Sequence, residues 1–208
     1  MAVGGEGAVQ YVGLAGAVGV IPEERDGDEI LVVAAQRDPA AFEALYTRYA
    51  RAVYRYCDRR LDDPESAADA TAAVFERAWV ALPRFKDRSF RAWLFRIAHN
   101  EVIDHYRRAT RRRHAPLEAA AEVPAPGPSP EDLSELADER ATIDGLLARL
   151  PEAQRRVVEL RLAGLDGTEI AFALGRTREA VKMLQFRAVR NLRSALAALD
   201  DLEDDDAR

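Results

Sequence analysis

A cluster of arginines near the middle of the chain could bind a polyanion. Five of them lie within seven residues, with no acidic residue among them: Arg107, Arg108, Arg111, Arg112 and Arg113. Between Arg84 and His114 the chain carries ten Lys/Arg and three Asp/Glu residues, a local charge of +7, although the net charge of all 208 residues is −6. A helix dipole needs only one or two cations at its end. The cluster therefore favours nucleic acid as the ligand over a merely solvated helix end.

A second cationic surface is predicted near the C-terminus, where the spacing is typical of a helix-turn-helix. Ala171 is small enough to let two helices approach, Gly175 permits the turn, and Val181 would pack into the angle between the helices. The outward positions of the second helix carry residue types that contact bases or phosphates: Arg178, Glu179, Lys182, Gln185, Arg187 and Arg190. A helical hairpin that binds no DNA is the alternative.

Apolar residues at three- and four-residue steps predict that helices carry both surfaces. The central helix spans Phe90–Arg113, and Ser89 would cap it. Asp-Pro pairs at 38–39 and 63–64 are typical helix starts. The other predicted helices are Asp28–Gln36, Asp38–Leu61, Glu65–Leu82, one through Ile143–Leu150, Pro151–Gly164, Thr168–Leu174 and Arg178–Leu199. Asp166 and Glu169 have capping-box spacing before the turn helix, and Thr177 can cap the last helix.

The fold class predicted from these patterns is all-α, with two small helical domains joined by a flexible linker. Five prolines and seven acidic residues, without Lys or Arg, separate the two halves at Pro116–Glu139. We expect a disordered tail at 1–27, a first domain at 28–114, the linker at 115–139, a second domain at 140–199 and a disordered acidic tail at 200–208.

Composition and motifs argue against several other classes of protein. Cys57 is the only cysteine, so neither a disulfide framework nor a Cys-based metal site is expected, and a reducing cytoplasm is predicted. No apolar run approaches a membrane span, and the N-terminus lacks the cationic start of a signal peptide. Glu101 and His105 are four residues apart, too few ligands for a metal site. With no phosphate loop or activated nucleophile, we expect neither an enzyme nor a bound cofactor.

Four segments of the chain, taken in order, resemble the sequences of one protein family. The segments FEALYTRYARAVYRYC, VFERAWVALPRF, FRAWLFRIAHNEVIDHYRR and LPEAQRRVVELRLAGLDGTEIAFALGRTREAVKMLQFRAVRNLR are similar to extracytoplasmic-function (ECF, group 4) sigma factors of bacterial RNA polymerase, in the sigma-70 family. The resemblance covers about Asp28–Leu196. It implies promoter recognition and transcription initiation in the cytoplasm, with the polymerase core and promoter DNA as partners. An anti-sigma factor is a further candidate partner.

The resemblance also implies roles for single residues. The sigma-2-like first domain would recognise and melt the −10 element through Phe85, Lys86, Asp87, Arg88, Ser89, Arg96, His99, Asn100, Asp104, Arg107, Arg108 and Arg111. The sigma-4-like second domain would contact the −35 element through Thr177, Arg178, Glu179, Lys182, Gln185, Arg187 and Arg190. Contacts with the polymerase core are implied for Asp69, Phe75, Arg77 and Trp79.

Two segments depart from the family pattern. Ser66–Ala73 replaces the usual acidic stretch of the core-docking helix and keeps only Asp69 as a polar contact group. In the last helix, Met183 and Leu184 stand where Ser-Arg is usual, so a different base readout is expected. The alternative function is a conventional helix-turn-helix regulator with an N-terminal sensor or dimerisation domain. Such a domain has no need of the cationic central helix.

Overall fold

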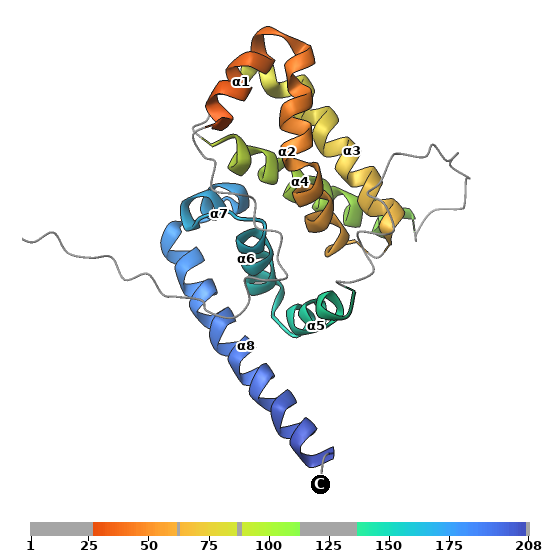
Figure 1. The fold of residues 1–208 in the computed structure, drawn as a ribbon, viewed down its shortest axis with the longest axis vertical. Helices are drawn as coiled ribbons and strands as arrows, with labels where there is room; N and C mark the ends of the chain where they lie inside the picture. Colours follow the sequence, from red (N-terminus) through yellow and green to blue (C-terminus); the bar gives the residue numbers. More distant parts are fainter. Residues whose placement is uncertain (1–26, 62, 87–88, 113–136, 207–208) are drawn as a thin grey trace, which may run out of the picture.

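The computed structural model describes residues 27–61, 63–86, 89–112 and 137–206, and the regular secondary structure of this part of the chain is entirely helical (Figure 1). The N-terminal unit contains α1 (Asp28–Arg37), α2 (Phe42–Asp58), α3 (Pro64–Ala81) and α4 (Phe90–Arg112), with 3-10 turns at Pro39–Ala41 and Leu82–Arg84. The C-terminal unit contains α5 (Ala137–Ala148), α6 (Glu152–Leu162), α7 (Gly167–Leu174) and α8 (Arg178–Asp206). The all-α prediction is confirmed. The predicted tail and linker lie almost wholly outside the described residues.

Of the two Asp-Pro pairs, only the one at 63–64 directly starts an α-helix. At the start of α3, the Asp63 carboxylate accepts a hydrogen bond of 2.7 Å from the Ser66 amide, as expected of an N-cap. The Asp38 carboxylate accepts one of 3.0 Å from the Ala40 amide, but a 3-10 turn follows. The α-helix therefore begins at Phe42, later than the sequence predicts.

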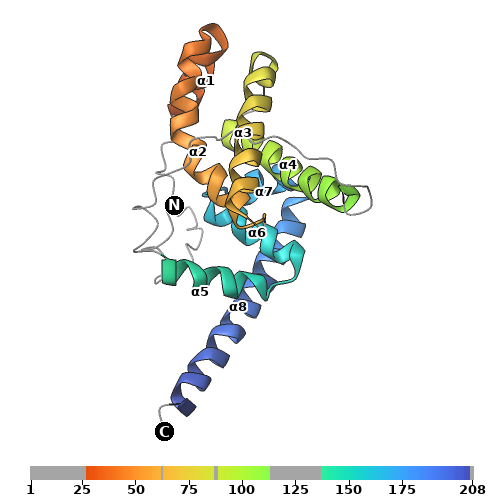
Figure 2. The ribbon, with the colours of Figure 1, turned by 90° about the vertical axis from the view of Figure 1, so that its right-hand side faces the viewer.

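The last helix is longer than predicted. α8 continues to Asp206, past the expected end at Leu199, so the prediction of a disordered tail is wrong for residues 200–206. No Gly or Pro interrupts the segment. Acidic residues are unfavourable near a helix C-terminus, but they are not helix breakers. The end of α8 projects away from the other helices (Figure 2).

The two units share one hydrophobic core. Leu94 and Ala98 of α4 belong to the same buried cluster as Leu160 of α6 and Ile170 of α7. α7 lies against α4, as both views show (Figures 1 and 2). A smaller cluster, which includes Ala188, packs α5 and α6 onto α8. The predicted helical units are thus not independent bodies in this structure but are packed together.

Candidate nucleic-acid interface

α4 changes from a buried to an exposed helix along its length. Leu94 and Ala98 are fully buried, whereas the Arg107 side chain is 69% exposed. Between them, the Tyr106 hydroxyl donates to the carbonyl oxygen of Arg60 and ties α4 to the end of α2. The apolar face of the first part of α4 is therefore buried, whereas Tyr106 is 41% exposed, and the cationic end of α4 extends beyond the core, where a phosphate backbone could reach it.

The start of α4 is covered by α7. The Ser89 hydroxyl donates to the Glu169 carboxylate at 2.7 Å and also caps α4 by accepting from the Ala92 amide at 3.1 Å. The Arg91 guanidinium lies 2.6 Å from the same carboxylate, in an ion pair largely shielded from water. Arg96 lies over the Phe172 ring, 5.1 Å from its centroid, in a cation–π contact.

His99 differs from its implied role at the −10 element. Its side chain is buried, with only 7% of the residue exposed, and its Nδ1 lies 3.1 Å from the Tyr56 hydroxyl. Burial, followed by the nearby Arg156 and Arg60, lowers the pKa of His99 to about 4. The imidazole is therefore neutral at pH 7 and does not face DNA in this arrangement.

The remaining residues implied at the −10 element fall into three groups. Lys86, Asn100, Arg107 and Arg108 are exposed, and Asp104 is partly exposed. Phe85 is partly buried against Phe90 and Trp93, with ring centroids 5.8 and 4.9 Å away. Asp87, Arg88 and the side chain of Arg111 lie outside the described residues.

Sequence reasoning missed the importance of Glu101. This carboxylate is 1% exposed and lies 2.7 Å from the Arg77 guanidinium of α3 and 2.6 Å from that of Arg108. It thereby connects the cationic end of α4 to α3. The available signal was its place on the apolar stripe, next to Val102, where a carboxylate needs a charged partner.

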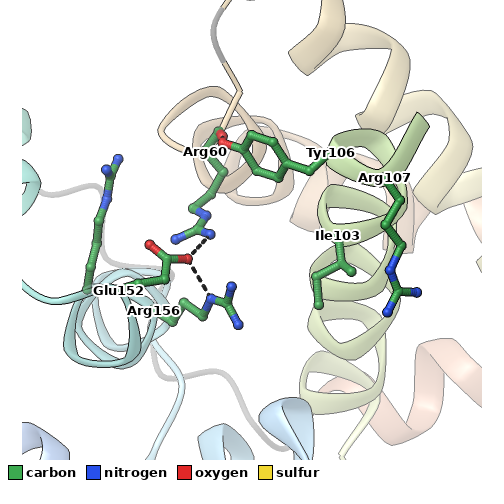
Figure 3. Close-up of a pocket in the computed structure, with 7 residues that line it drawn as sticks. Arg60, Ile103, Tyr106, Arg107, Glu152 and Arg156 are labelled. Atoms are coloured by element: carbon green, nitrogen blue, oxygen red, sulfur yellow. Dashed lines mark hydrogen bonds and ion pairs between the residues drawn. The ribbon is translucent and has the colours of Figure 1, made fainter. Parts of the chain in front are cut away.

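A second group of charged residues joins the two units (Figure 3). Arg60, in the turn that follows α2, pairs with Glu152 and lies 3.3 Å from the buried Glu159 of α6. Arg155 lies 2.7 Å from Glu159 and donates to the carbonyl oxygen of Arg59 at 2.5 Å. The adjoining pocket has a volume of about 350 Å³. Because carboxylates already pair with these guanidinium groups, the cluster serves to hold the units together.

The helix-turn-helix has the predicted geometry. The capping box is present, since the Asp166 carboxylate accepts from the Glu169 amide and the Glu169 carboxylate accepts from the Asp166 amide. Gly175 adopts the left-handed conformation, with φ of 61°, between α7 and α8. Thr177 caps α8 by accepting from the Ala180 amide at 3.2 Å. The exposed residues of α8 include Arg178, Glu179, Lys182, Arg187 and Arg190, as predicted.

Gln185 is the exception among the predicted outward residues of α8. Its side chain turns toward α6, where its carboxamide oxygen accepts from the Arg161 guanidinium at 2.9 Å. A charged neighbour on α6 thus binds this side chain in the absence of DNA, and its contact with bases stays a prediction. Two apolar residues that the prediction did not include, Met183 and Phe186, are instead 50% and 66% exposed.

The comparisons with known proteins match both units. The sigma-70 region 2 model matches residues 45–112, and the sigma-70 region 4 model matches residues 146–194. The ECF RNA polymerase sigma factor SigD of Mycobacterium tuberculosis is 32% identical over 202 residues, which cover 94% of this chain and 95% of that protein. This chain belongs to the ECF sigma factors. The family supports a role in transcription initiation over that of a conventional helix-turn-helix regulator.

One further relative and two solved structures are similar to this chain. BldN of Streptomyces coelicolor is 36% identical over 166 residues, covering 78% of this chain and 63% of that protein. CnrH, solved in complex with the cytosolic domain of CnrY, is 29% identical with a TM-score of 0.63, over 83% of this chain and 99% of that one. RpoE of Bartonella quintana shares the fold at 22% identity and a TM-score of 0.57, over 75% and 96% of the two chains.

The residues implied at the core-polymerase surface of this sigma factor do not share one exposed face. Asp69 and Trp79 are exposed on α3, and Arg77 is half exposed while paired with Glu101. Phe75 is buried against Tyr46, with ring centroids 4.7 Å apart, so a direct contact of its side chain with the polymerase core is not supported.

Beside Asp69, the small side chains of Ala70 and Ala73 help line an open pocket of about 650 Å³ between α3 and α4.

Within the described residues of this ECF sigma factor, no group of three or more His, Cys, Asp or Glu side chains is placed to hold a metal ion. No helix in the same part of the chain is long and apolar enough to cross a membrane.

Proposed function

We propose that this sigma factor directs the bacterial RNA polymerase core to promoters through two DNA contacts. α8 would enter the major groove of the −35 element, and the cationic end of α4 would bind and help open the −10 element. The observation that carries the proposal is the presence of two separate exposed cationic surfaces in one ECF chain, the end of α4 and the first part of α8, where Arg178, Lys182, Arg187 and Arg190 are exposed. Exposed guanidinium and ammonium groups suit phosphate contacts, and α8 suits major-groove entry.

Its partners follow from the same assignment. The exposed side of α3, around Asp69 and Trp79, would dock on the polymerase core. An anti-sigma factor is a second proposed partner, supported by RpoE, whose structure was solved in complex with the anti-sigma factor NepR. The protein would act in the cytoplasm, as an initiation factor rather than an enzyme, and would need no cofactor.

Run-off transcription tests this function. Core polymerase is supplied with a fragment library, with and without this protein. We expect discrete transcripts that depend on the protein, and their start sites will define both promoter elements. Sequence-selective binding by the isolated protein without such transcripts would instead indicate a conventional regulator.

A further inference from the structure

The outward face of α8 carries two large apolar side chains among charged ones. Val181 and Ala188 are fully buried and mark the inner face of the helix. Met183 and Phe186, three residues apart, are 50% and 66% exposed and lie on the opposite face. Together, the two side chains place a considerable apolar area in contact with solvent.

The neighbours of this pair connect it with DNA binding. Glu179 and Arg190 fall on the same helical face, at spacings of four residues from Met183 and Phe186, and both are exposed. Lys182 and Arg187 flank the pair and are exposed as well. The apolar side chains are thus bordered by cations of the kind that hold a helix against two phosphate backbones. Gln185, which faces Arg161, leaves the centre of this face to them.

In the major groove, the apolar group offered by the bases is the C5-methyl of thymine. We propose that Met183 and Phe186 make this sigma factor selective for thymine in the −35 element by packing against thymine methyl groups. The inference rests on the proposed placement of α8 in that element. Met183 and Phe186, which were not among the predicted DNA contacts, would then recognise bases through apolar contact.

The test removes the methyl group alone. A promoter identified by run-off transcription is prepared with deoxyuridine in place of each thymine of the −35 element, one position at a time on either strand. Holoenzyme affinity is measured by fluorescence anisotropy. Loss of one buried methyl contact should weaken binding roughly fourfold at one or two positions, while deoxyuridine elsewhere in the element has no effect.

Variants assign the effect to the two residues. In Met183→Ala or Phe186→Ala holoenzyme, we expect weaker binding to the thymine promoter and no further loss with deoxyuridine at the matching position. Leu196→Ala is the matched control, because Leu196 is an apolar residue of α8 that is 39% exposed, further along the helix. It should retain the full deoxyuridine effect. Circular dichroism checks that each variant is folded.

The outcomes separate this inference from the proposed function. If −35 mutations weaken binding but deoxyuridine does not, or if the element holds only G·C pairs, thymine readout is overturned while the −35 contact stands. If the alanine variants keep the wild-type deoxyuridine response, other residues contact the methyl groups, and the assignment is overturned. If transcription is lost in the variants with promoter affinity unchanged, the pair contacts protein instead. If no upstream element affects binding, both proposals fail.

Discussion

At the scale of single residues, His99 is a buried base that folding keeps neutral. Burial lowers its pKa to about 4, below the value of about 6.5 expected in the unfolded chain. Between these values the unfolded state binds more protons, so the free energy of unfolding falls as the pH drops through this range. At pH 5 the loss due to His99 should be about 2 kcal/mol relative to pH 7.5. Urea unfolding at the two pH values measures it.

His99→Gln isolates this contribution from the carboxylates that titrate in the same range. Glutamine does not titrate and can still hydrogen-bond to the Tyr56 hydroxyl, the partner of His99. We expect the variant to lose less stability than wild type between pH 7.5 and pH 5. An equal loss in both proteins would show that the imidazole is not protonated on unfolding.

Glu101 gives a second prediction at this scale. Its buried carboxylate bridges Arg77 and Arg108, so Glu101→Gln removes charge attraction to two guanidinium groups without changing the shape of the side chain. We expect the free energy of unfolding to fall by about 1–3 kcal/mol. Glu76→Gln is the matched control, because Glu76 lines the same pocket but is exposed and should change stability by less than about 0.5 kcal/mol. Equal effects of the two changes would argue against a structural role for the bridge.

At the scale of elements, two glycines of the C-terminal unit should respond oppositely to alanine. Gly175 has a φ of 61° in the turn before α8, so Gly175→Ala should destabilise the protein by about 1 kcal/mol. Gly145 lies within α5, where an added Cβ would meet nothing within 4 Å. Gly145→Ala should therefore stabilise by about 0.5–1 kcal/mol through helix propensity. Thermal unfolding measures both, and destabilisation of similar size by both changes would contradict the argument.

Elements were predictable where the signal was local. The capping box of α7 and the Ser89 cap depend on residues within three positions of one another, and both are confirmed. Partners distant in sequence were not predictable. Glu169 completes the capping box but also pairs with Arg91, which is distant in sequence and lies on α4. Gln185 turns inward because it hydrogen-bonds to Arg161 of α6. Apolar periodicity shows which face is buried without showing what covers it.

At the scale of the whole molecule, one carboxylate and one ring of α7 add to the shared core and the Arg60 cluster in holding the two units together. Glu169 binds Ser89 and Arg91, and Phe172 lies under Arg96, so α7 covers the start of α4. Residues 113–136 are long enough to span about 80 Å when extended, so the covalent connection permits separation of the units. Binding of two promoter elements by α4 and α8 would favour a separated arrangement.

We therefore expect that weakening the contact between α4 and α7 opens the free protein. Arg91→Ala combined with Phe172→Ala removes the ion pair and the cation–π contact but spares the capping box and the exposed cations of α4 and α8. The radius of gyration from small-angle X-ray scattering should increase, whereas Phe186→Ala with Arg187→Ala, the same two residue types on the exposed face of α8, should leave it unchanged. The opened variant should start transcription at least as well as wild type, because neither altered residue belongs to the proposed DNA contacts. Unchanged scattering together with weaker transcription would mean that the α4–α7 contact supports the fold and does not restrain DNA binding.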